Sequence, residues 1–405
     1  MGCKKNWIFE WVAIIGIFLF FATAVAGADK FYITPKFTAG WQAESNYWKS
    51  ETDEREVFTY LLQPGIEAGY ETAKSMFALD YTLSAFFYDD QDSVPAGELK
   101  ADDDDYLGHT AILKARTTPT ARLLLGLDNS FYLTRNPAQT DAVDNTISRD
   151  KYYINRFTPQ MVYELGGRFS AGLRYRNTIT KYLEGNNEDS LEDRGMLDLI
   201  YNLSRTALMD LDYQHWRRNY DGDTSDYTSN QLALILKKQF KYLSLEAGGG
   251  YQNRRFDDSD LDDISTPIYR GAITGQYPPA PASPSSHLAL IFEQNFNDQG
   301  LGNQYYVARR LTLRAGYVFL EKIVTTLEGW FQNSDYKDVT GITSSGATEK
   351  RDDDTYRIFG SIGYRFFDWM QFSVGGGYED RDSNIVGLSY DNKFIRAQLD
   401  FAYKF

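Results

Sequence analysis

Beyond residue 28 the chain alternates between apolar and polar positions with a period of two. The last segment, residues 393–405, shows this most clearly, with aliphatic and aromatic residues at odd positions and mostly polar ones at even positions. Because successive side chains of a β-strand point to opposite faces, the pattern predicts a strand with one apolar face. The alternation recurs in residues 77–84, 169–176, 243–252 and 356–366.

Two kinds of connection separate these segments, and they alternate along the chain. Short turns are predicted at residues 72–75, 117–120, 166–167, 204–205, 239–241, 320–322 and 367–369, with the Pro-rich segment 277–285 as an enlarged turn. Longer, mostly acidic loops are predicted at residues 50–56, 89–104, 136–149, 184–193, 221–226, 257–266, 297–303, 338–353 and 383–389. Such a chain contains about 18 strands, with about 16 as the alternative, and both ends lie on the side of the short turns.

Three features favour a membrane barrel over a soluble β-sandwich, which also alternates. The predicted strands exceed the usual length of soluble strands. Aromatic residues gather at strand ends, as in Phe86–Tyr88, where a membrane interface needs them. The chain also ends in an alternating strand whose Phe401, Tyr403 and Phe405 resemble the signal that outer-membrane insertion machinery recognises. The predicted fold is therefore all-β, a transmembrane antiparallel up-and-down β-barrel.

The N-terminus has the pattern of an export signal. Lys4 and Lys5 precede an apolar stretch over residues 14–21, and small residues then offer cleavage sites after Ala26 or Ala28. A retained membrane anchor is the alternative interpretation. We expect a cleavable signal peptide over residues 1–28 and an outer-membrane β-barrel over residues 29–405.

Composition excludes several classes of function. The 405 residues carry a formal net charge of −14, which argues against a nucleic-acid partner. The single cysteine and three histidines give no Cys-based metal or haem site and no recognisable catalytic set. The acidic runs 102–105 and 257–263 lack the spacing of an EF-hand. We therefore expect no cofactor, no bound metal and no enzymatic activity.

Several short motifs resemble the second putative β-barrel porin family. They are the run 216–220 (WRRNY), the segments 225–227, 243–251 and 254–256, and the run 305–313 (YYVARRLTL). Members of that family are outer-membrane barrels often associated with exopolysaccharide export. The resemblance implies a channel and suggests polysaccharide as its cargo.

The alternation also predicts which polar side chains face the lumen. The predicted pore-lining residues are Arg174, Arg176, Asp210, Asp212, Gln214, Glu246, Glu293, Arg310, Arg314, Arg357, Arg365, Arg396 and Asp400. Acidic members concentrate in the ninth to thirteenth strands and basic members in the fourteenth to eighteenth, while Arg174 and Arg176 stand apart. One hypothesis is an electric field across the pore; the alternative is that these charges pair with their neighbours. Loops 89–104 and 338–353 are candidate constrictions.

The sequence thus predicts a passive channel in the outer membrane of a Gram-negative bacterium, with polysaccharide export as the main function. A general or solute-selective diffusion porin is the first alternative. A barrel that sheathes a partner such as a multihaem cytochrome is the second. The expected partners are outer-membrane lipid and lipopolysaccharide, the barrel-insertion machinery and periplasmic polysaccharide-export components.

Overall fold

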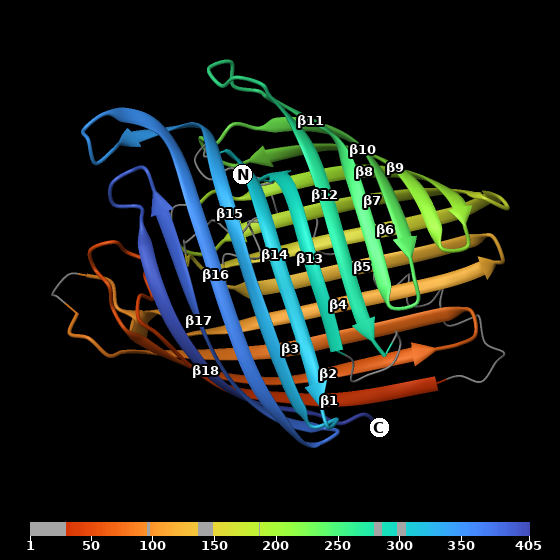
Figure 1. Ribbon diagram of the computed structural model, residues 1–405, viewed down its shortest axis with the longest axis horizontal. Coiled ribbons are helices and arrows are strands. Elements are labelled where there is room, and N and C mark those ends of the chain that lie inside the picture. Colours follow the sequence, from red (N-terminus) through yellow and green to blue (C-terminus); the bar gives the residue numbers. More distant parts are fainter. Residues whose placement is uncertain (1–29, 95–97, 137–148, 186, 279–285, 298–304) are drawn as a thin grey trace, which may run out of the picture.

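The computed structural model describes residues 30–94, 98–136, 149–185, 187–278, 286–297 and 305–405 (Figure 1). The predicted signal peptide and most of the Pro-rich turn lie outside these residues. In the described part of the chain, no helix is both long and apolar enough to cross a membrane.

The described residues form eighteen strands and one short 3-10 helix. The elements are β1 (Lys30–Glu44), β2 (Val57–Glu71), β3 (Ser75–Asp90), η1 (Ala101–Asp104), β4 (Tyr106–Thr120), β5 (Leu123–Thr134), β6 (Tyr152–Gly166), β7 (Phe169–Tyr182), β8 (Ser190–Ser204), β9 (Ala207–Tyr220), β10 (Tyr227–Gln239), β11 (Leu243–Phe256), β12 (Ile264–Tyr277), β13 (Ser286–Phe296), β14 (Tyr306–Phe319), β15 (Ile323–Ile342), β16 (Thr348–Phe367), β17 (Met370–Ser383) and β18 (Tyr390–Ala402).

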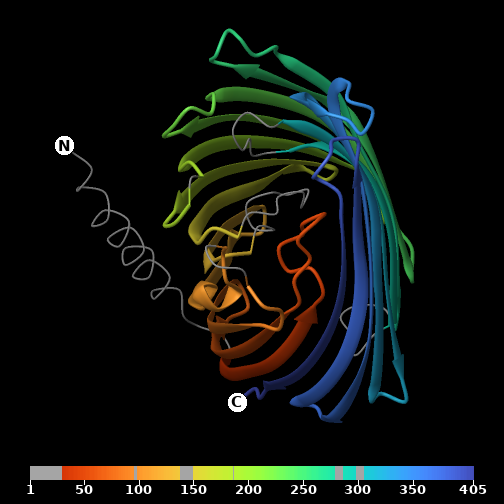
Figure 2. The same ribbon diagram turned by 90° about the vertical axis from the view of Figure 1, so that its left-hand side faces the viewer.

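Each strand pairs antiparallel with its neighbours in sequence, and β1 pairs with β18, which closes the sheet. The closing pair runs from Lys36 opposite Ala402 to Glu44 opposite Phe394. Figure 2 shows the strands as a ring around a central space. Closure removes the free sheet edges that lipid could not satisfy with hydrogen bonds. The predicted fold class and number of strands are confirmed.

Several predicted connections differ from the structure. The predicted loops 184–193 and 257–266 are too long, because β8 begins at Ser190 and β12 at Ile264. Strands β15 and β16 are 20 residues long, so only residues 343–347 connect them and the predicted loop 338–353 is wrong. The alternation simply continues there, with Arg351 and Asp353 buried and their neighbours exposed. The turn predicted at 117–120 is also wrong, because β4 continues to Thr120 across a register shift and residues 121–122 make the turn.

The two faces of the wall differ as the alternation requires. Along β9, the side chains of Leu211 and Tyr213 are exposed on the outer surface, whereas Asp212 between them is buried on the inner side. Other exposed apolar residues, such as Leu232 and Leu234 of β10, continue the apolar outer surface. An apolar outside and a polar inside match a barrel surrounded by lipid and filled with water.

The C-terminal residues continue the pairing with β1 beyond the end of β18. The amide of Tyr403 donates to the carbonyl of Pro35 at 3.2 Å, and that of Phe405 donates to the carbonyl of Ile33 at 2.9 Å. The ring of Phe401 lies beside that of Trp369, with 6.1 Å between ring centroids. The terminal strand is thus part of the barrel seam, while its role as an insertion signal stays a prediction.

Candidate functional site: the lumen and its loop layer

On one part of the inner wall, acidic side chains of β8 and β9 contact an arginine of β7. Arg174 makes ion pairs with Asp198 at 2.8 Å and Asp212 at 3.4 Å. Gln214 donates to Asp212 at 2.8 Å. Asp210 lies on the same side of β9, two residues before Asp212. The structure therefore brings Arg174 to these predicted acidic residues rather than leaving it apart.

A second paired group spans β10 to β13. Glu246 lies 3.5 Å from the ammonium of Lys237 and 3.0 Å from the guanidinium of Arg270. Arg270 also pairs with Glu293 at 2.9 Å. Lys237 and Arg270 thus neutralise Glu246 and Glu293. The sequence analysis did not select these two basic residues.

The predicted basic residues of β14 have contacts of two kinds. Arg310 donates to Gln332 at 2.7 Å and lies over the ring of Trp330, 4.5 Å from its centroid. Arg314 pairs with Glu328 at 3.2 Å, and both side chains are about half exposed. These contacts place both arginines on the inner wall of β14 and β15.

The remaining predicted residues lie on β16 to β18. Arg357 pairs with Glu379 at 3.5 Å, and Arg396 lies over the ring of Phe359. Arg365 stands opposite Gln371, which in turn stands opposite Asp400. Asp400 accepts hydrogen bonds of 2.7 Å from Thr38 and from Gln398. The function of all these residues in lining a pore, and the transverse field, stay predictions.

Arg176 belongs to a buried cluster around Glu192 that the sequence analysis did not identify. The carboxylate of Glu192 is 1% exposed and contacts Arg194 at 3.0 Å, Arg218 at 2.6 Å and Arg176 at 3.1 Å. Arg194 in turn lies over Trp216, 4.0 Å from the ring centroid. Three guanidinium groups around one carboxylate bind β7, β8 and β9 together on the inner side of the wall.

Arg254 of β11 lies at the centre of an aromatic cluster. Its guanidinium stands 4.0 Å from the ring centroids of both Tyr227 and Phe296, and it donates to the carbonyl of Asn297 at 2.8 Å. Tyr305 completes the cluster and donates to the carbonyl of Ser225. Burial raises the pKa of Tyr305. The cluster joins the segment before β14 to β10, four strands away.

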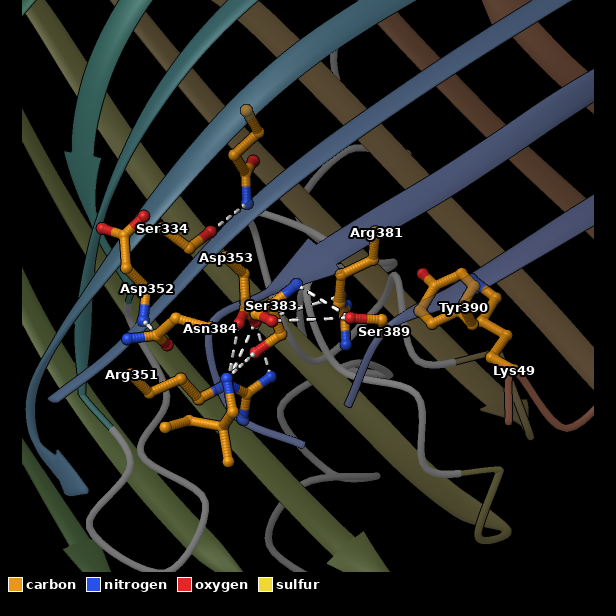
Figure 3. Close-up of polar contacts among 12 residues, drawn as sticks. Lys49, Ser334, Arg351, Asp352, Asp353, Arg381, Ser383, Asn384, Ser389 and Tyr390 are labelled. Carbon is orange, nitrogen blue, oxygen red and sulfur yellow. Dashed lines mark hydrogen bonds and ion pairs between the residues drawn. The ribbon is translucent and has the colours of Figure 1, made fainter. Parts of the chain in front are cut away.

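A third buried charge cluster lies near the loop ends of β16 and β17 (Figure 3). Asp353 is fully buried and accepts hydrogen bonds from Arg351, the shortest at 2.6 Å, and Arg381 lies 3.9 Å away. Beside it, Lys49 pairs with Glu379 at 2.5 Å. Lys49 comes from the connection between β1 and β2, so this contact ties that connection to β17.

The connections at this end of the barrel fold inward and form what we call the loop layer, which comprises residues 45–56, 91–94 and 98–105 with Arg135 and Arg149. Arg149 contacts Glu44 at 3.6 Å and stacks on Tyr47, 3.8 Å from its ring centroid. Arg149 precedes β6 and Glu44 ends β1, which are five strands apart, or about 24 Å along the wall. The contact requires segments that leave the wall, and Figure 2 shows these loops inside the ring of strands.

Polar contacts fix the loop layer internally. Arg55 donates to the carbonyl of Leu99 at 2.7 Å, and Arg135 pairs with Asp104 at 3.2 Å. Burial raises the pKa of Tyr47 to about 12 and also raises the pKa of Asp104, which Arg135 partly offsets. The predicted constriction at 89–104 therefore contributes an inward-folded segment, whereas the segment 338–353 contributes a β-hairpin.

The molecule is a closed barrel with an apolar outer face, a charged inner face and loops folded inward at one end. Residues 241–403 match the family model described as putative beta-barrel porin 2. Over these residues, the match confirms the predicted resemblance to that porin family. No curated protein matches the chain.

Solved structures show that the fold is that of outer-membrane porins. The chain resembles Pseudomonas aeruginosa OccK9 (OpdG), with a TM-score of 0.51, 12% identity, and coverage of 93% of this chain and 99% of that one. It also resembles Acinetobacter baumannii OccAB3, with a TM-score of 0.50, 10% identity, and coverage of 93% and 100%. At such identities the likeness concerns the fold alone.

The match over residues 241–403 and the closed barrel support a β-barrel channel in the Gram-negative outer membrane. They give no support to polysaccharide as the cargo. Among the described residues, no three His, Cys, Asp or Glu side chains are grouped so that they could hold a metal ion.

The clusters that the sequence analysis missed do carry a signal in the sequence. Charged residues alternate on the inner side at the loop ends of strands, as Glu192 and Arg194 do in β8 and Arg351 and Asp353 do in β16. On an inward face, two opposite charges two residues apart indicate a local ion pair rather than a pore-lining charge. Glu192, Arg351 and Asp353 fell within the predicted acidic loops 184–193 and 338–353, so this pattern was not recognised.

Proposed function

We propose that the barrel is a diffusion porin for small hydrophilic solutes. The observation that carries the proposal is the closed ring of 18 strands with a charged inner face. A ring of this size is too wide for wall side chains to fill and encloses an aqueous channel. The loop layer covers part of the cross-section, which suits solutes of small size.

The loop layer also favours a diffusion porin over polysaccharide export and over a sheath around a protein partner. Glu44 and Arg149 link β1 to the segment before β6, five strands away, and Lys49 and Glu379 link the β1–β2 connection to β17. A long polymer or a sheathed protein partner needs a lumen free of such crossings along its path. Polysaccharide export rests only on what is common in the family, and the cytochrome sheath rests on no contact in this barrel.

Single-channel current through the refolded barrel in a planar bilayer tests the proposal. The proposal predicts stable steps whose size is proportional to salt concentration and does not change when the host's polysaccharide is added. Block of the steps by the polymer would support export instead. Absence of steps from protein that migrates as a folded barrel in unheated gels would contradict a diffusion channel and favour a filled lumen.

A further inference from the structure

The strands β16, β17 and β18 carry a row of residues in register on the inner wall. Phe359 of β16 stands opposite Gly377 of β17, which stands opposite Phe394 of β18. The two rings stack with 5.9 Å between centroids and 11° between planes. The row thus forms an aromatic platform over the glycines of β17.

Glycine makes this platform possible. A Cβ at Gly377 would overlap with the ring of Phe394, and a Cβ at Gly375 would lie 2.8 Å from Cζ of Phe359. Glycine inside a strand commonly permits such a close approach. The glycine run 375–377 therefore lets two rings fold down onto the wall instead of projecting into the channel.

Two arginines lie on this platform. The guanidinium of Arg357 is 4.9 Å from the centroid of Phe394, and that of Arg396 is 4.9 Å from the centroid of Phe359. Stacking on a ring holds a guanidinium by its face and leaves its N–H edge available to a ligand. Arg396 is solvent-exposed and the side chain of Arg357 is 38% exposed, so both can be reached from the lumen.

The charges around the platform leave it positive. Glu379, the carboxylate paired with Arg357, is shared with Lys49 at 2.5 Å and accepts a hydrogen bond from Tyr390 at 2.8 Å. No carboxylate of the described residues lies within ion-pair distance of Arg396. Asp400 on the same strand attracts the Arg396 guanidinium from a longer distance. It also accepts hydrogen bonds from Thr38 and Gln398. Arg357 and Arg396 also repel each other, and an anion between them would relieve this repulsion.

We propose that Arg396 and Arg357, held on the rings of Phe359 and Phe394, form a binding site in the lumen for the carboxylate of a small organic solute. The inference rests on the proposed function, because the site must lie on a solute path. Two guanidinium edges offer the paired N–H donors that a carboxylate accepts. The site selects solutes by their charged group as they pass along this side of the channel.

Glucuronate block of single-channel current tests the site, with glucose as the neutral sugar of similar ring size. The expected result is block of the wild-type channel by glucuronate and none by glucose. In the R396Q variant, block should require a roughly 10-fold higher concentration, because one charge-assisted contact is lost. F359L, which removes the stacking surface of Arg396, should weaken block in the same direction.

The matched control is R314Q, which removes the same charge from the same face of the wall at an arginine already paired with Glu328 at 3.2 Å. Glucuronate block should stay within about 2-fold of wild type there, since Arg314 has no part in the platform. Equal loss of block in R314Q and R396Q would overturn the site in favour of general lumen charge, as would a wild-type channel that glucuronate does not block. Absence of any current would overturn the proposed function, and the site with it. Gel mobility of unheated samples verifies that each variant has folded.

Discussion

Replacing Glu192 with glutamine should destabilise the barrel strongly while leaving its shape almost unchanged. The carboxylate is 1% exposed and is bonded to Arg176, Arg194 and Arg218 at 2.6–3.1 Å. Glutamine is isosteric but neutral, so three guanidinium groups would stay close together without the negative charge between them. Removing one partner of a buried ion pair costs about 3–5 kcal/mol.

The control is the same substitution at Glu246. Its side chain is also on the inner wall and also has two cationic partners, but it is 24% exposed and Arg270 keeps its second carboxylate, Glu293. Water can replace the lost charge there, so we expect a cost of about 0–1 kcal/mol. The contrast isolates burial, because the chemistry of the two changes is identical.

The assay is equilibrium unfolding of each refolded barrel in lipid vesicles by urea. Urea is uncharged, whereas guanidinium chloride would screen the charges under study. A second change, Arg194→Gln, made together with Glu192→Gln, should restore part of the lost stability because one uncompensated charge is removed. A free energy of unfolding for Glu192→Gln within about 1 kcal/mol of wild type would refute the reasoning.

Three further predictions concern the loop layer and the barrel seam. Arg149→Ala removes the contacts with Glu44 and Tyr47, so single-channel records should show larger and noisier steps than wild type; identical records would count against a constricting layer. Burial raises the pKa of Asp104, so as pH falls its pair with Arg135 should break at a higher pH than a pair with an exposed aspartate would. Current noise should therefore rise in mild acid, and Asp104→Asn should show that noise at every pH. Deleting Phe405, whose amide bonds to β1, should slow barrel insertion by the purified insertion machinery, measured as the appearance of the heat-modifiable band.

The strand count could be predicted because one rule governs the whole wall. A residue in this barrel faces lipid or lumen, so every strand repeats the same period of two, as Leu211, Asp212 and Tyr213 illustrate. At the loop ends of β15 and β16 the burial of side chains still alternates, but the outward positions are no longer apolar. The polar sequence there therefore looks like an acidic loop, although β15 and β16 continue through it.

Partners across the wall could be predicted less well than positions on it. The alternation along each strand predicts that Glu246 and Glu293 face inward. It does not predict that Arg270 lies between them, because that contact depends on the register of neighbouring strands. The contacts of the loop layer could not be predicted from the sequence. Contacts such as Arg149 with Glu44 depend on loops that cross the lumen, and no period in the sequence encodes them.

The glycine run 375–377 illustrates what sequence reasoning can and cannot give. A close approach of backbone or side chains is expected at glycines within a strand. Which groups approach follows only from register, which sets Gly377 between Phe359 and Phe394.

Solute uptake by vesicles that contain the refolded barrel shows whether small hydrophilic solutes diffuse through the channel. Vesicles swell when an external solute enters with water, so the swelling rate reports passage through the channel without any assumption about ions. A diffusion porin should admit pentoses and hexoses rapidly, and the entry rate should fall steeply for larger oligosaccharides that the loop layer excludes. Vesicles with folded barrel that admit small sugars no faster than empty vesicles would contradict the proposed function.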